Sequence, residues 1–549
     1  MNLDINLLET LTDHSQYPAD LKACLNSRGL YNSMQFVLRL SPEIHRKIDA
    51  LPEGISNLTV DPEGVQAFST YLHETIHWWQ HVGSTIGLML SLSYPVQLHS
   101  NYNQLKRVPG KIGAKKSIRQ VVESIAESSI KLTADPDSID GVLNRIVNNY
   151  FDIEFFRLLI TKPLAAFDAA KDPFFDCVGH SYVITQANVT LLIASMFDKD
   201  LSILPNPMSW EHEFTKLREQ KEPGWYWGSG IGLPSVGAWE IFEGQARFIQ
   251  LQYLHFALGT TWEDAEEIGM LHGRYVKAFE EFLNLAELGW PPSIDHPTVA
   301  LFLLICDMAI NPGSGFPMNL DIPKTFITDT DPGLRFMFLA RIVALVHPDL
   351  ANVVRDYSRT EYLEVSEKLA SAILVHSPHM VSSQVSNWLD QSKPLTILME
   401  EYKTFSYSNE NLAIRVIFSH FLAFNKDKSD RPEFFCWPGA WMAGARVSND
   451  IKVLFDRHLA LFMDKADDDG IFPRLVPGRD DGEVHKAFET FYSANVTYDM
   501  TRQWVAMPGP FQYDYRWLST SATYSETKQF ADHNFEQAYG IHPDTVQIL

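Results

Sequence analysis

The residues best placed to do chemistry lie in the segment 71–79, Tyr-Leu-His-Glu-Thr-Ile-His-Trp-Trp. His73 and His77 are four residues apart, so on an α-helix they share one face, with Cβ atoms roughly 5–6 Å apart. Two imidazoles at that spacing can bind one Zn²⁺ through bonds of about 2.0–2.1 Å. Glu74 is rotated about 100° from His73 and can act as a general base toward water on the metal. The H-E-x-x-H pattern therefore predicts metal-assisted hydrolysis.

The motif is predicted to lie on one helix over residues 61–92. Asp61 is a favourable N-cap residue, Pro62 suits the first helical position, and Glu63 places an acid in the first turn. The helix is apolar on more than one side, so we expect it to be largely buried. Its small and apolar positions recur at helical spacing, at Val65, Phe68, Leu72, Ile76, Trp79, Gly83, Ile86 and Leu90.

Strands are expected only near the N-terminus. Residues 34–40 alternate well enough for a strand, and residues 57–60 could pair with them, which predicts a small sheet at residues 30–60. Helical periodicity dominates afterwards, so the expected fold class is mainly α with a small β-sheet (α+β). Clear examples of this periodicity are residues 118–132, 139–159, 183–197 and 239–258.

Two histidines rarely complete a catalytic zinc site, which usually has three protein ligands and a water. The best candidate for the third ligand is Glu243, in a helix predicted over residues 236–258 that Gly259 would end. A second interpretation makes Glu243 the partner of Arg247 in an i,i+4 ion pair on the helix surface. Glu240 is the next candidate for the ligand.

With this second element, the chain resembles the zincin metallopeptidases of the gluzincin type. In that group one helix bears H-E-x-x-H and a later helix supplies a glutamate, often followed by small residues that let the two helices approach each other. Glu243-Gly244-x-Ala246 is similar to that second element. The resemblance implies Zn²⁺ held by His73, His77 and Glu243, and cleavage of an amide bond in a peptide or protein substrate.

In zincins an edge strand above the active helix holds extended substrate by β-addition, a role that residues 34–40 or 57–60 could take. Three further residues are candidates for contacts around the metal ligands: His81, Glu240 and His296. His81 lies about 12 Å along a straight helix from His73, so it could share the ion only if the helix broke near Gly83. The Asp-His-Pro triplet that ends at Pro297 is more typical of a helix cap.

Size and charge narrow the classes of function. A chain of 549 residues with a net charge of -23 lacks the basic surface that nucleic-acid binding needs. No segment is apolar enough to cross a membrane, and the N-terminus lacks the pattern of a secretory signal. The four cysteines are far apart and are expected to be free thiols. We therefore expect a cytoplasmic protein with no nucleic-acid or membrane partner.

Residues 311–333 are rich in Gly, Pro and Asp, which predicts a domain boundary there. Residues 1–320 would form the catalytic region, and residues 334–549 a mainly helical region that could bind a protein partner.

Three hypotheses follow. The first is a zinc-dependent hydrolase, most simply a peptidase. The second is a non-catalytic helical scaffold in which the motif arose by chance or has degenerated. The third is a different metalloenzyme, with iron or zinc on the same two histidines and one carboxylate.

Overall fold

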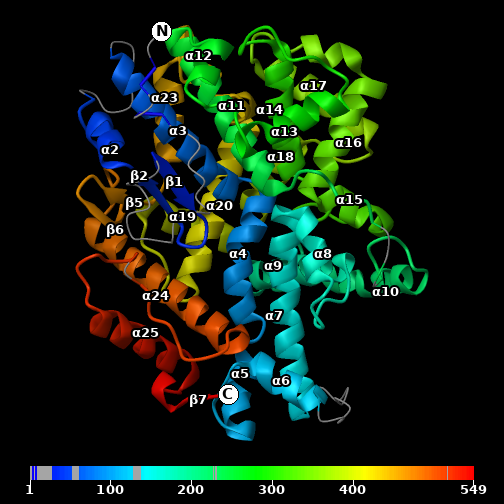
Figure 1. The fold of residues 1–549 in the computed structure, drawn as a ribbon, viewed down its shortest axis with the longest axis vertical. Coiled ribbons are helices and arrows are strands. Elements are labelled where there is room, and N and C mark those ends of the chain that lie inside the picture. The colour runs from blue at the N-terminus through cyan, green and yellow to red at the C-terminus, as the bar shows by residue number, and fades with distance from the viewer. Residues whose placement is uncertain are drawn as a thin grey trace.

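The computed structural model is mainly helical with a small mixed sheet, so the predicted fold class is confirmed (Figure 1). The described residues are 3–4, 7–8, 28–51, 61–127, 138–226, 228, 231–515 and 517–549.

Five helices position the site: α3 (Pro62–Gly83), α4 (Thr85–His99), α7 (Ile139–Thr161), α11 (Ala238–Leu258) and α13 (Arg274–Leu285). The other helices of the described chain, apart from short 3-10 turns, are α2 (Pro42–Asp49), α5 (Tyr102–Ile112), α6 (Ile118–Glu127), α8 (Ala166–Ala169), α9 (Val178–Phe197), α10 (Glu211–Glu219), α12 (Trp262–Glu267), α14 (Pro297–Ile310), α15 (Phe326–Thr330), α16 (Pro332–Leu345), α17 (Arg359–Ala372), α18 (Pro378–Gln391), α19 (Lys393–Thr404), α20 (Leu412–Asp430), α21 (Pro432–Cys436), α22 (Pro438–Trp441), α23 (Asn449–Arg457), α24 (Asp481–Ala506) and α25 (Tyr524–Tyr539). The four helices predicted from periodicity are present as α6, α7, α9 and α11, and residues 128–132 of the first prediction lie outside the described residues.

The start of α3 follows the prediction. The carboxylate of Asp61 accepts a hydrogen bond from the backbone N–H of Glu63, and Pro62 occupies the first turn. Beyond this turn nearly every residue of α3 is buried, as expected for a helix that is apolar on several sides. The helix packs against α11, α20 and the sheet.

The prediction of one helix over residues 61–92 is wrong at its centre. Ser84 adopts an extended conformation (φ -90°, ψ 155°) that ends α3, and its hydroxyl accepts a hydrogen bond from the N–H of Gly87 to cap α4. The chain changes direction there, because Gly87 packs directly on the last turn of α3. A Cβ atom at Gly87 would overlap the carbonyl oxygen of Gln80 and lie 2.6 Å from the Cα of His81.

Helix α11 matches its predicted range closely, and Gly259 ends it in the left-handed conformation (φ 74°). Gly244 does not have the predicted role of letting α11 approach α3. A Cβ atom on Gly244 would lie 3.2 Å from Ala278 and 3.3 Å from Phe302, so the absent side chain makes room for α13 and α14.

The sheet joins distant parts of the chain. Its order is β1-β2-β5-β6, with β1 (Gly29–Asn32) antiparallel to β2 (Val37–Leu40), β2 parallel to β5 (Phe462–Lys465), and β5 antiparallel to β6 (Asp468–Pro473). Figure 1 shows the blue N-terminal strands beside the orange C-terminal ones. Strands β4 (Lys115–Lys116) and β7 (Gln547–Ile548) form a separate parallel pair.

The predicted sheet at residues 30–60 is therefore only partly correct. Its first half is present as β1 and β2, whereas residues 42–49 form α2 and residues 57–60 lie outside the described residues. The predicted edge strand at residues 34–40 is present in part as β2, which lies inside the sheet, and β1 is the outermost of the described strands on that side. Sequence reasoning missed β5 and β6, and the pairing of β5 with β2 crosses the predicted domain boundary at residues 320–334. That boundary stays a prediction.

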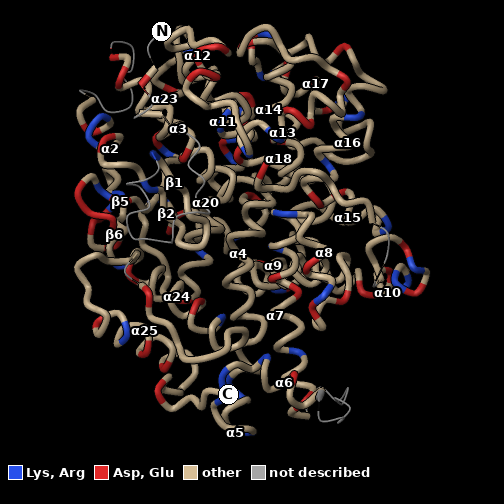
Figure 2. Tube along the Cα trace, in the orientation of Figure 1, with Lys and Arg blue, Asp and Glu red and all other residues tan. Residues whose placement is uncertain are grey.

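Within the described residues, no helix has both the length and the apolar character that crossing a bilayer requires. Figure 2 shows acidic and basic positions interspersed along the elements in view.

We expect Gly87→Ala to destabilise the protein by about 1–3 kcal/mol, because the added methyl group overlaps the backbone of α3. Thermal unfolding of the variant measures the effect. Gly110→Ala is a matched control inside α5, since a Cβ atom there meets nothing within 4 Å. An unchanged unfolding midpoint for Gly87→Ala would contradict the tight junction of α3 and α4.

Candidate metal centre

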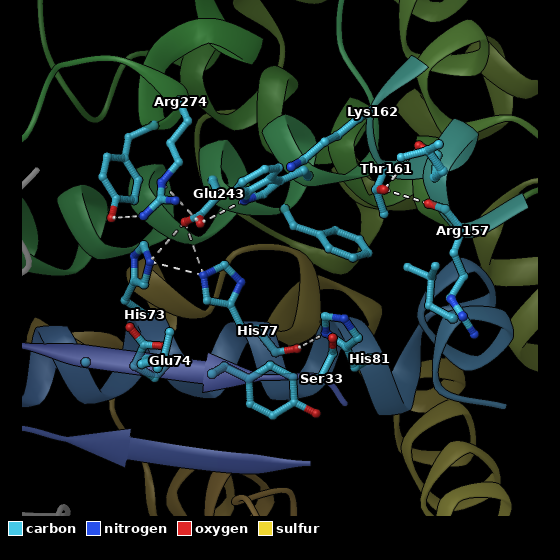
Figure 3. Close-up of a pocket in the computed structure, with 18 of the residues that line it drawn as sticks. Ser33, His73, Glu74, His77, His81, Arg157, Thr161, Lys162, Glu243 and Arg274 are labelled. Atoms are coloured by element: carbon cyan, nitrogen blue, oxygen red, sulfur yellow. Dashed lines mark hydrogen bonds and ion pairs between the residues drawn. The ribbon is translucent and has the colours of Figure 1, made fainter. Parts of the chain in front are cut away.

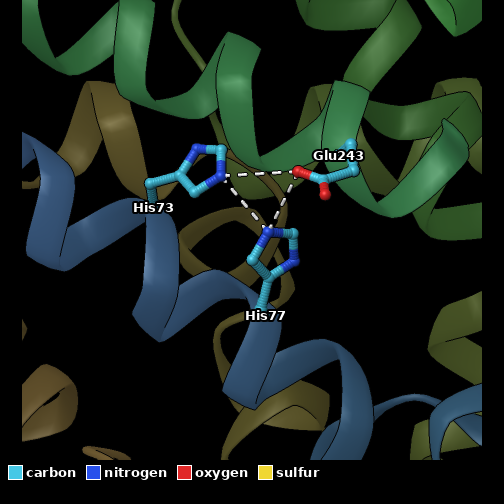
Figure 4. Close-up of side chains that lie close together, drawn as sticks. All are labelled: His73, His77 and Glu243. Carbon is cyan, nitrogen blue, oxygen red and sulfur yellow. Dashed lines mark hydrogen bonds and ion pairs between the residues drawn. The ribbon is translucent and has the colours of Figure 1, made fainter. Parts of the chain in front are cut away.

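Three side chains from two helices converge on one point (Figure 4). The Nε2 atoms of His73 and His77 are 3.2 Å apart, and Oε2 of Glu243 lies 3.3 Å from Nε2 of His77 and 3.7 Å from Nε2 of His73. Ligand atoms bound to Zn²⁺ in a tetrahedron, at about 2.0–2.1 Å, are themselves about 3.3 Å apart. The spacing of these three atoms therefore matches what one small cation requires.

Glu243 offers only one of its oxygens to this point. Its Oε1 atom accepts a hydrogen bond from Nε1 of Trp239 at 3.3 Å and lies 3.4 Å from Nε of Arg274. These contacts orient the carboxylate so that Oε2 faces the two imidazoles (Figure 3). The predicted ion pair of Glu243 with Arg247 is absent: the Arg247 guanidinium lies 4.1 Å from the centroid of the Tyr275 ring instead.

Gln80 fixes the tautomer of His77. The amide nitrogen of Gln80 donates hydrogen bonds to the carbonyl oxygen of Phe242 (3.0 Å) and to Oε1 of Gln245 (2.8 Å). Its amide oxygen therefore faces Nδ1 of His77 at 2.9 Å, and Nδ1 must carry the proton. In the neutral form of His77 the lone pair is thereby placed on Nε2, the atom that faces Glu243, as metal-binding histidines require. Sequence reasoning missed this role of Gln80, which lies three residues after His77 and so on a neighbouring position of the same helix.

Burial and charge set the protonation of the three residues. Burial lowers the pKa of His73 to about 3, so this ring is neutral. Burial also opposes charge on His77, but the Glu243 carboxylate outweighs it and raises the pKa of His77 to about 9. Burial disfavours the Glu243 carboxylate in turn, yet the charge of His77 and hydrogen bonds from both histidines hold its pKa well below the usual value. Without a cation, His77 and Glu243 thus form a buried ion pair.

Glu74 lies beside the three residues and under the end strand of the sheet. Only 3% of Glu74 is exposed, and a Cβ atom on Gly29 of β1 would lie 2.5 Å from its Cγ. Glycine at position 29 lets the strand pass directly over the carboxylate, which lines the same cavity as the histidines (Figure 3). Because position 29 comes before the strand predicted from alternation, its role could not be read from the sequence pattern.

A cavity of about 570 Å³ opens over these residues, within the usual range of small-ligand sites. One end is lined by His73, His77, Glu243 and Arg274, and the other end by Arg157 and Lys162 from the C-terminal part of α7 and the residue after it. The remaining lining residues are Gly29, Leu30, Tyr31, Ser33, Glu74, His81, Leu90, Tyr94, Glu154, Leu158, Thr161, Trp239, Phe242 and Tyr275.

Of the three residues predicted to lie around the ligands, only His81 lines this cavity. Its Nδ1–H donates to the carbonyl oxygen of His77 at 2.9 Å, and burial lowers its pKa to about 4. Glu240 was a wrong prediction, because it caps the start of α11 and pairs with Lys277 at 3.0 Å. His296 was also wrong: it is the N-cap residue of α14, as the alternative interpretation held.

A second group of possible ligands lies near the C-terminus, at Asp532, His542 and Asp544. The ammonium of Lys528 lies 2.5 Å from Asp532 and 2.9 Å from Asp544, so both carboxylates of this group are already paired with a cation of the protein. We therefore assign the metal-binding geometry to the first cluster alone among the described residues.

The chain matches no family model, and no curated protein or solved structure was found to be similar to it.

We expect Gln80→Leu to weaken zinc binding by roughly 10–100-fold, because His77 loses the acceptor that fixes its tautomer. Competition with a chromophoric chelator measures the affinity. Gln220→Leu, at the exposed end of α10, is the matched control. Equal affinities for wild type and Gln80→Leu would contradict the proposed role of Gln80.

Proposed function

We propose that this protein is a zinc-dependent hydrolase whose substrates are peptides. The observation that carries the proposal is the convergence of His73, His77 and Glu243 at zinc-like spacing beside Glu74, inside a cavity large enough for a ligand. The hydrogen bond from His77 to Gln80 supports the same conclusion, because it keeps a proton on Nδ1 and so makes Nε2 the nitrogen that can exchange its proton for a cation.

When bound, Zn²⁺ supplies a water nucleophile of lowered pKa and a Lewis acid for the substrate carbonyl. Glu74 lies one residue after His73 and lines the same cavity, so it would serve as the general base for a water molecule there and would return the proton to the leaving amine. Arg274 and Tyr275 line the same cavity and carry N–H and O–H groups that would donate to a substrate oxygen there.

The end strand of the sheet favours a peptide substrate. β1 lines the cavity through Gly29, Leu30 and Tyr31, and within the described residues it pairs only with β2. An extended chain can add to such a strand through backbone hydrogen bonds. The sequence predicts such a substrate-binding strand at residues 34–40 or 57–60, and we propose β1 for it instead.

Iron on the same ligands is the second candidate, because two histidines and one carboxylate also suit Fe²⁺. The buried carboxylate of Glu74 beside the ligands favours hydrolysis, since water activation needs a base there. A scaffold without a metal would not need the orientation of three ligand atoms toward one point.

The decisive experiment is metal analysis of wild type beside three variants. Wild type is expected to hold about one zinc per chain, and His77→Ala and Glu243→Ala to lose it. Glu74→Gln should keep the metal while peptide turnover falls by roughly 10²–10⁴-fold. His212→Ala and Glu219→Gln, at exposed positions of α10, are the controls.

Full metal retention in His77→Ala would remove the proposed centre. Stoichiometric iron with oxygen-dependent turnover would select the iron enzyme instead.

Zinc binding should also depend on pH. Because the pKa of His77 is raised to about 9, the cation must displace one proton at neutral pH. Affinity should therefore rise about tenfold per pH unit between about pH 6.5 and 8.5, and level off above the pKa of His77. His73 adds no dependence there, because its pKa is lowered to about 3.

Titration calorimetry in two buffers of different ionisation enthalpy measures the released proton directly. Binding that is independent of pH over this window would contradict the assigned protonation of His77.

A further inference from the structure

A second cavity of about 390 Å³ lies next to the metal cavity, at the turn that joins β1 to β2. It is bounded by this turn, by α4, by α24 and by Gln512, Asp514, Tyr515 and Trp517. Six aromatic rings line it: Phe36, Tyr94, Phe491, Tyr498, Tyr515 and Trp517.

Four charged residues line this aromatic cavity, Arg39, Asp499, Arg502 and Asp514, and each of them has a partner within the protein. The guanidinium of Arg39 donates to the carbonyl oxygens of Asp469 and Trp517. The carboxylate of Asp499 accepts hydrogen bonds from Arg502 and from the hydroxyl of Tyr515. A ligand here therefore meets mostly ring faces and amides, and an uncharged aromatic group is the chemistry that fits them.

The side chain of Asn495, on α24, adds an amide to the residues that line the aromatic cavity.

The two cavities share part of their walls. Leu30, Ser33 and Tyr94 line both of them. Strand β1 starts over Glu74 at Gly29 and leads to the turn where the aromatic cavity begins. Four residues of strand cover about 13 Å, which is the span of about four residues of an extended peptide lying alongside.

We infer that the aromatic cavity is a subsite for the same substrate, and that it binds an aromatic side chain three or four residues from the cleaved bond. This inference rests on the proposed peptidase function. The substrate is then an extended peptide that spans both cavities.

The test begins with a mixture of random peptides of ten residues, digested by the zinc-loaded protein and read by mass spectrometry. Phe, Tyr or Trp should be enriched three or four residues from the cleaved bonds, on one side only. In a single peptide built from that pattern, changing the aromatic residue to Ala should lower kcat/KM by roughly 10–100-fold.

Two variants that fill the aromatic cavity test its part in this preference. Asn495→Trp and Gln35→Trp each place a ring in the cavity. In each variant the ratio of kcat/KM for the aromatic peptide to kcat/KM for its Ala counterpart should fall below about threefold. Asn409→Trp, in an exposed loop, is the matched control and should keep it. Thermal unfolding shows whether each variant is folded, and the second variant serves if the first is not.

Cleavage without aromatic enrichment, or with the preference intact in both folded variants, overturns the inference and leaves the peptidase proposal standing. If no peptide is cleaved, binding of a fluorescent aromatic peptide and of its Ala counterpart decides. In that case the hydrolase proposal fails. The subsite is still supported if wild type binds the aromatic peptide more tightly than its Ala counterpart and both variants lose this difference. Equal binding of the two peptides overturns the subsite as well.

Discussion

The packing of α3 against α11 is the contact on which the rest of the molecule depends. The two helices run antiparallel, with Gln80 bonded to the carbonyl oxygen of Phe242 at one end of the contact and Gln250 bonded to Ser69 at the other. These buried polar contacts fix the register of one helix along the other. A slide of one residue, about 1.5 Å, would move Glu243 out of range of an ion on the imidazoles.

The same contact explains how so many polar groups can be buried together. An isolated ion in this interior would be strongly unfavourable, but His77 and Glu243 neutralise each other and Arg274 is paired with the same carboxylate. The buried charges of this cluster therefore compensate one another, and the two rings and the carboxylate face one point.

Local signals in the sequence were enough to predict where α3 begins and that α11 ends at Gly259, but not to predict the strands and the helix junction that surround α3. The cap at Asp61, the periodicity of α3 and the terminating Gly259 depend on near neighbours, and all three were correct. The break at Ser84 follows from Gly87 packing on a preceding turn, and the pairing of β2 with β5 joins residues more than 400 positions apart. No local pattern encodes such contacts. Glu243 was found only through its resemblance to a known ligand helix.

The pairing of β2 with β5 has a consequence for synthesis on the ribosome. The helices that carry the ligand atoms are complete at residue 258, but β5 is not available until residue 465 has been made. At about 5–20 residues per second, translation separates these events by roughly 10–40 s. Until then the strand over Glu74 lacks the neighbour that anchors its hairpin, so a nascent chain cannot acquire the finished cavity before most of its length has emerged.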